Sequence, residues 1–176
     1  MTLLDACLKA HHESALRGNC SHHALVMSAV GSGDYFKSIA AALLTLGGTH
    51  APLTQTYDLL AAPNALELVE QAIHDKRRVP GWGNTFYKGT PDPAWIECAV
   101  KLAEDAPVLT ATIDSITKYL HICGKNIYPN PSCYTAAVAL TLGIPRAAVG
   151  VILLQGRLRA WTEEYGRVAQ EAPRTL

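Results

Sequence analysis

The stretch Val79-Pro80-Gly81-Trp82-Gly83-Asn84-Thr85-Phe86-Tyr87-Lys88, followed closely by Asp92-Pro93, interrupts a chain that otherwise carries helical patterns. Two glycines flank a tryptophan, and glycine leaves backbone N–H groups open to the approach of a bound molecule. Lys88 follows within reach of such a molecule. We therefore interpret residues 79–93 as a ligand-binding turn between two helical layers, and we expect a cleft there.

Apolar residues recur at helical spacing on both sides of this turn, whereas strand signals are nearly absent. The apolar stripes occupy residues 35–46, 66–73, 95–103 and 109–120. Asp92 and Pro93 suit the N-cap and first position of a helix, and Pro131 and Gly143 bracket another segment. Pro145 opens a last, strongly apolar helix that we expect to be the most buried. The sequence predicts an all-α protein with a single compact domain.

The charge balance gives no sign of a nucleic-acid or membrane partner. Fifteen Lys and Arg residues balance fifteen Asp and Glu residues, so the chain has no net charge and no strong electrostatic field to attract nucleic acid or an anionic membrane. The N-terminal residues lack the basic and apolar regions of a signal peptide. We expect a cytoplasmic protein that binds anions locally. The run Lys76-Arg77-Arg78 suits phosphates, although a solvated helix end would look the same.

Cysteine and histidine patterns indicate neither disulfides nor a metal site. The five cysteines are odd in number, scattered and without a C-x-x-C motif, which is typical of reduced, packed thiols. They are Cys7, Cys20, Cys98, Cys123 and Cys133. The adjacent pairs His11-His12 and His22-His23 would diverge on a helix, so we expect no metal ion.

Four segments, in order, resemble blocks of the citrate synthase and citryl-CoA lyase superfamily. Residues 79–93 resemble its coenzyme A loop, where Val-Pro-Gly-aromatic-Gly-His precedes a basic residue and Asp-Pro-Arg. Residues 128–135, Tyr-Pro-Asn-Pro-Ser-Cys-Tyr-Thr, resemble the Tyr-Pro-Asn-Val-Asp-Phe-Tyr-Ser run that carries the catalytic aspartate. Residues 19–50 resemble paired dimer-interface helices that lead to the first active-site histidine. Residues 153–161 resemble a helix with a carboxylate-binding arginine.

The resemblance implies a citrate synthase-like helical fold, reduced to the small domain plus a few large-domain helices. Within a single domain of residues 1–176, residues 1–62 and 145–176 would supply large-domain-like dimer helices. Residues 63–144 would form the small-domain-like part that binds coenzyme A. The implied partners are a CoA thioester, a carboxylate and a second copy of the chain.

Four positions carry the family's chemistry by resemblance: His50, Asn84, Ser132 and Arg157. The reaction that the resemblance implies is the formation or cleavage of a carbon–carbon bond next to a thioester carbonyl. His50 and Asn84 would polarise carbonyl groups. Ser132 would orient a water or substrate, and Arg157 would hold a carboxylate. His50 could instead be a capping or solvated histidine, and Arg157 could instead form an internal salt bridge.

Three of the family's functional side chains are replaced in this sequence. Asn84 stands at the second histidine position and cannot shuttle protons, and Ala94 stands where the family has an arginine. Ser132 stands at the aspartate position, and an unassisted hydroxyl is too weak a base to abstract a carbon-bound proton. Cys133 could act as a thiolate or could be a packed thiol.

The family residues that bind coenzyme A are better preserved in this sequence than those that carry out the reaction. By resemblance, the coenzyme A contacts are Val79, Gly81, Trp82, Gly83 and Lys88. Trp82 could stack on adenine or belong to the core. We expect a protein that binds a CoA thioester and that, if it is an enzyme, acts as a citryl-CoA lyase or an acyltransferase of the citrate synthase type. The alternative is a catalytically inactive module that binds a ligand or a protein.

Overall fold

The computed structural model describes residues 1–46 and 51–171, and in these ranges the regular structure is helical. This confirms the predicted all-α class. The α-helices are α1 (Leu3–Ser14), α2 (Cys20–Ser32), α3 (Tyr35–Leu44), α4 (Leu53–Ala61), α5 (Ala65–His74), α6 (Ile96–Asp105), α7 (Pro107–Ile122), α8 (Pro131–Thr141) and α9 (Val149–Glu171). Short 3-10 helices, η1 (Pro93–Trp95) and η2 (Arg146–Ala148), precede α6 and α9. In the described ranges, no helix is long and apolar enough to cross a membrane.

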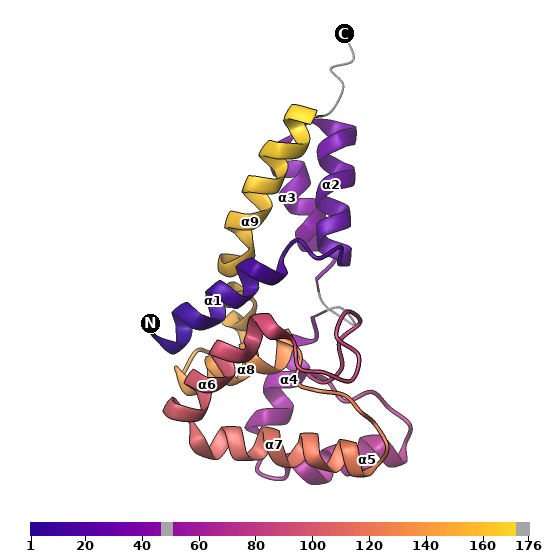
Figure 1. Cartoon of the computed structure of the whole chain (residues 1–176), viewed down its shortest axis with the longest axis vertical. Helices are drawn as coiled ribbons and strands as arrows, with labels where there is room; N and C mark the ends of the chain where they lie inside the picture. The colour runs from indigo at the N-terminus through magenta and orange to yellow at the C-terminus, as the bar shows by residue number, and fades with distance from the viewer. Residues whose placement is uncertain (47–50, 172–176) are drawn as a thin grey trace.

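The helices form an arm and a body (Figure 1). The arm consists of α2, α3 and the C-terminal part of α9, and the body contains α4 to α8. Helix α1 lies across α9 and also packs on α6 and α8, so it joins the two parts. Helix α4, which we expected among the dimer helices, packs on α8 and belongs to the body.

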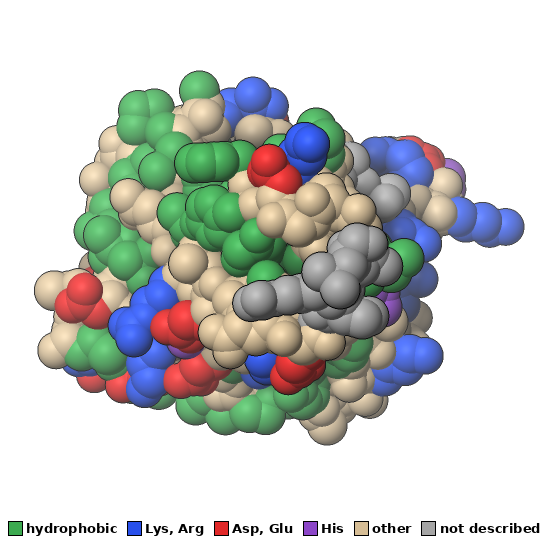
Figure 2. Space-filling model, turned by 90° about the horizontal axis from the view of Figure 1, so that it is seen from above, with side chains coloured by type: hydrophobic (Ala, Val, Ile, Leu, Met, Phe, Trp, Pro, Cys, Tyr) green, Lys and Arg blue, Asp and Glu red, His purple; other side chains and the backbone are tan. Residues whose placement is uncertain are grey.

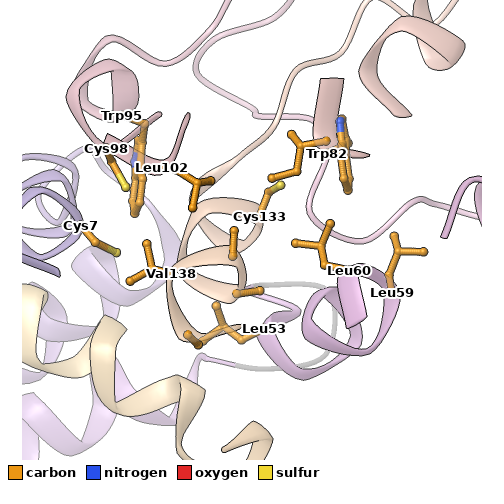
Figure 3. Close-up of a cluster of buried hydrophobic side chains, with 14 of the residues drawn as sticks. Cys7, Leu53, Leu59, Leu60, Trp82, Trp95, Cys98, Leu102, Cys133 and Val138 are labelled. Atoms are coloured by element: carbon orange, nitrogen blue, oxygen red, sulfur yellow. The ribbon is translucent and has the colours of Figure 1, made fainter. Parts of the chain in front are cut away.

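Each part has its own hydrophobic core. The body's core gathers buried side chains from α1 and α4 to α9, including Trp95, Leu102 and Val138 (Figure 3). The arm's smaller core consists of Ala15, Leu25, Ile39, Ala42, Ala160 and Trp161. Burial of this apolar surface is the main favourable term in folding.

Local signals explain where several helices begin. Asp92 accepts a hydrogen bond from the backbone N–H of Ala94, and Asn130 does the same for Ser132 at the start of α8. These caps satisfy donors that have no partner inside the helix. The proposed N-cap and proline at 92–93 are therefore confirmed.

Two expectations about burial are wrong. The last helix is not the most buried, because α9 buries one face and leaves Val151 half exposed. That description fits α8, whose buried side chains run from Ser132 to Ala139 with one interruption at Tyr134. Cys20 and Cys123 are exposed free thiols rather than packed ones.

Candidate functional site

The turn at residues 79–83 adopts a backbone conformation that requires glycine. Gly81 and Gly83 both have φ of 89°, in the left-handed region that side chains disfavour. A Cβ atom at Gly81 would lie 2.5 Å from Cγ2 of Thr56 on α4. The first glycine therefore lets the turn pack directly on α4.

Residues 128–130 hold this turn from the other side. The backbone N–H of Gly83 donates to the carbonyl of Tyr128 (2.9 Å), and that of Asn130 donates to the carbonyl of Gly81 (2.9 Å). The Asn130 amide also donates to the carbonyl of Gly83 (2.9 Å), while its oxygen caps α8. Asn130 thus couples the turn to the helix that carries Ser132.

A groove with a volume of about 1230 Å³ opens beside the turn. Its lining contains five basic residues, all exposed: Lys76, Arg77, Arg78, Lys88 and Lys125. None of the described residues in its lining is Asp or Glu. We call this surface the cationic groove. The positive charge is concentrated here in a chain whose overall charge is balanced.

The five residues expected to contact coenzyme A all line the cationic groove. Lys88 is exposed, whereas Val79 and Gly81 are buried in its wall. Trp82 is 6% exposed, and its indole N–H donates to Oγ1 of Thr117 (2.9 Å). Of the two interpretations of Trp82, membership of the core is the one that the geometry favours (Figure 3).

Asn84 lies in the groove wall with its amide orientation fixed. Its Oδ1 accepts from the backbone N–H of Phe86 (2.9 Å), and its Nδ2 donates to Oδ2 of Asp92 (3.2 Å). An amide nitrogen has two hydrogens, so one donor is left for a ligand. Asp92 also binds Arg17, whose Nη1 lies 2.7 Å from each carboxylate oxygen. Sequence reasoning missed Arg17.

Ser132 and Cys133 lie outside the groove lining. Ser132 is 5% exposed at the start of α8. Cys133 is fully buried, and burial raises the pKa of its thiol, so the reactive thiolate is disfavoured. Of the two interpretations of Cys133, the packed thiol fits this environment.

Arg157 lies in a separate buried group of polar side chains, which we call the Arg157 cluster: His11, Ser21, Thr135 and Arg157. Arg157 is 5% exposed and donates from Nη1 to Oγ of Ser21 (3.2 Å), while its Nε has no partner. No carboxylate of the described residues pairs with it, contrary to the internal salt bridge we considered. Burial lowers the pKa of Arg157 to about 10.

His11 is held in one tautomer by Thr135. The Thr135 hydroxyl donates to the carbonyl of Pro131 (2.6 Å), so it accepts from Nε2–H of His11 (2.7 Å). Nδ1 of His11 then carries a free lone pair and has no partner. Burial, together with the charge of Arg157, lowers the pKa of His11 well below its usual value. His11 is therefore a buried neutral imidazole.

The structure thus gathers the expected coenzyme residues and Asn84 around one groove and places Ser132 and Arg157 elsewhere. His50 lies outside the described residues. In the described ranges, no group of three or more His, Cys, Asp or Glu side chains could hold a metal ion.

Comparisons with known proteins identify the family of the chain. Residues 1–167 match the model of the family "Citrate synthase, C-terminal domain", and the chain belongs to this family. A citrate synthase from Synechocystis is 24% identical over 177 residues, which cover 93% of this chain and 44% of that protein.

Solved structures show the same fold. Citrate synthase from Thermotoga maritima is 25% identical with a TM-score of 0.80, and the match covers 94% of this chain and 48% of that one. Citryl-CoA lyase from Hydrogenobacter thermophilus is 19% identical with a TM-score of 0.76, covering 99% of this chain and 72% of that one. The chain spans about half the length of the citrate synthases that it matches.

Proposed function

We propose that this protein binds a CoA thioester in the cationic groove. The observation that carries the proposal is the groove lining, whose described residues include five basic side chains and no acidic one. Coenzyme A carries a diphosphate and a 3′-phosphate, and such groups are bound by Lys and Arg side chains and by open backbone N–H groups. Family membership supports the same ligand class.

The rest of the groove suits the remainder of the coenzyme. Ile73, Val79, Pro80 and Ile127 line it alongside the basic residues and offer an apolar surface to the pantetheine arm. The free N–H of Asn84 would donate to the thioester carbonyl. By family resemblance His50 would polarise a second carbonyl. Ser132 and Arg157 do not line the groove, so the roles that the resemblance gives them, orienting a water or substrate and binding a carboxylate, would be played outside it.

Calorimetric titration with CoA, dephospho-CoA and pantetheine tests this proposal. We expect CoA to bind most tightly, because each phosphate lost removes charged contacts, and we expect added salt to weaken binding. Replacing Lys88→Met or Lys125→Met should each weaken CoA binding roughly tenfold. The matched control is Arg159→Met, since Arg159 lies on α9 and pairs with Glu163. Equal affinities for CoA and pantetheine would refute the proposal.

A second function, binding without turnover, is favoured by the chemistry of the groove lining. Among the described residues, the lining holds no carboxylate, imidazole or thiol that could take a proton from carbon. Incubation with citryl-CoA, followed by detection of acetyl-CoA, separates a lyase from a binder. Release of acetyl-CoA that is lost in Asn84→Ala would support the lyase. CoA binding without any release would support the inactive module.

We also propose that the arm forms a homodimer through α2 and α3. Met27, Val30, Phe36 and Leu44 are between 57% and 86% exposed on these helices, and such apolar surface is typical of an interface. Figure 2, which shows the molecule from above, has hydrophobic side chains gathered at its upper left and charged side chains at its lower left. Sedimentation of the wild type and of Phe36→Asp tests the proposal, and a monomeric wild type would contradict it.

A further inference from the structure

Arg17 and Asp92 form an ion pair in which only one edge of the guanidinium is used. Nη1 of Arg17 donates to both oxygens of Asp92, at 2.7 Å each. No hydrogen bond to a described residue occupies Nε or Nη2, and 22% of the Arg17 side chain is exposed. The Nε–Nη2 edge, which can hold a carboxylate through two parallel hydrogen bonds, is therefore open to a ligand.

Asp92 is built to orient Arg17. Its side chain is 2% exposed and accepts four hydrogen bonds in total, two from Arg17, one from Asn84 and one from the backbone N–H of Ala94. A buried carboxylate with these four hydrogen bonds is fixed in place. It holds the guanidinium in one direction, so little rotamer freedom is left to lose when a ligand binds.

The pair lies directly behind the wall of the cationic groove. The Arg17 guanidinium lies over the Tyr87 ring, 5.2 Å from its centroid, and Tyr87 lines the groove. Asn84, which donates to Asp92, lines the groove as well. Because Asn84 and Arg17 donate to the same carboxylate, a ligand bound at Asn84 would lie near Arg17.

We infer that Arg17 binds a carboxylate on the acyl part of the thioester and thereby selects acyl groups that carry one. This inference rests on the proposed function of the groove. Position 94, next to the same aspartate, is an alanine and offers no cation. Arg157 lies buried in a different cluster and does not line the groove. Arg17 lies over the groove-lining Tyr87 ring and shares the Asp92 carboxylate with the groove-lining Asn84.

Titration with acetyl-CoA and succinyl-CoA tests the inference, because the two thioesters differ by a free carboxylate on the acyl group. For the wild type we expect succinyl-CoA to bind roughly tenfold to a hundredfold more tightly than acetyl-CoA. Arg17→Met should abolish this difference and leave the affinity for acetyl-CoA nearly unchanged. Arg17→Lys keeps a cation beside Asp92 but lacks the two-donor edge, so it should lose most of the difference.

Controls separate this role from a structural one. Lys125→Met should weaken both thioesters by the same factor, since Lys125 lies in the groove and does not contact Asp92. The inference is overturned if the wild type binds both thioesters equally, or if Arg17→Met folds and keeps the preference for succinyl-CoA. If neither CoA nor acetyl-CoA binds the wild type, the groove proposal itself fails, and this outcome is distinct from binding without a preference.

Discussion

The cationic groove and the Arg157 cluster hold positive charge in opposite ways. In the groove, exposed Lys and Arg side chains are solvated and surround a fixed backbone turn. In the cluster, Arg157 is buried, has a lowered pKa and meets a neutral histidine and hydroxyl groups. Solvated charges can attract an anion at low cost, whereas a desolvated cation without a counterion is costly to keep.

This difference indicates which residues determine ligand affinity and which determine the stability of the fold. Substitutions of the groove's basic residues should change ligand affinity and leave folding almost unaffected, because exposed charges contribute little to stability. The turn and the cluster depend instead on close packing, at Gly81 in one case and at Gly156 in the other. Both glycines can be tested against a matched glycine nearby.

The largest effect is expected for Gly81→Ala, in the wall of the groove. A Cβ at this position would meet Cγ2 of Thr56, which is buried and tied to the carbonyl of Pro52 by its hydroxyl (2.7 Å). Overpacking and a positive φ together should lower the free energy of unfolding by about 4 kcal/mol. Urea denaturation followed by circular dichroism measures this change.

Gly83→Ala is the matched control, since Gly83 has the same φ of 89° but its Cβ would only touch Ile127 at 3.9 Å. It should cost about 1–2 kcal/mol, from backbone strain alone. Equal losses for the two variants would mean that the turn does not pack on α4 as the structure has it.

Gly156→Ala is expected to have the next largest effect, in the Arg157 cluster. Its Cβ would lie 2.4 Å from Cβ of His11 and 2.9 Å from the carbonyl oxygen of Leu8, so α1 and α9 would have to separate. We expect a loss of about 3 kcal/mol in the free energy of unfolding. Thermal and urea unfolding of the purified variant would measure the loss.

Gly166→Ala on the same helix provides the comparison, because nothing lies within 4 Å of its Cβ. It should stabilise the protein by up to about 1 kcal/mol, as alanine is the better helix former. A Gly156→Ala variant as stable as Gly166→Ala would show that α1 and α9 are not in close contact at this point.

Sequence reasoning recovered the features that depend on neighbouring residues. The N-cap at Asp92, the start of α8 at Pro131 and the glycine turn at 81–83 are local signals, and the structure has each of them. It did not single out α4, whose N-cap residue, Pro52, makes no side-chain capping bond. The expectation about burial of α9 failed because burial depends on which helices surround an element rather than on its own apolar content.

In the candidate site, too, contacts between residues far apart in the sequence could not be predicted. The ion pair of Arg17 and Asp92 joins residues 75 positions apart, and the bond from Trp82 to Thr117 spans 35 positions. The sequence around each of these residues does not indicate which distant residue it will contact. Sequence patterns could therefore name the groove-lining residues at 79–88, because these lie in one continuous stretch. They could not show that Arg157 lies in a different environment.

The smallest expected effect concerns pH and separates the neutral cluster from the charged groove. Because His11 has a folded-state pKa well below its unfolded value of about 6.5, the unfolded chain takes up the proton first as pH falls. The contribution of His11 to stability is complete above about pH 7. Below about pH 6 the free energy of unfolding should fall by about 1.4 kcal/mol per pH unit from this group.

Urea unfolding between pH 5 and pH 8 compares the wild type with His11→Gln and His74→Gln. The glutamine at position 11 can still donate to Thr135 but does not titrate. Below pH 6, the slope of the free energy of unfolding against pH should therefore decrease by the contribution of one titrating group. His74→Gln is the surface control, because the His74 side chain is 84% exposed and lies outside the Arg157 cluster. An unchanged slope in His11→Gln would mean that the imidazole stays protonated beside Arg157, and the cluster would then resemble the groove in carrying solvated charge.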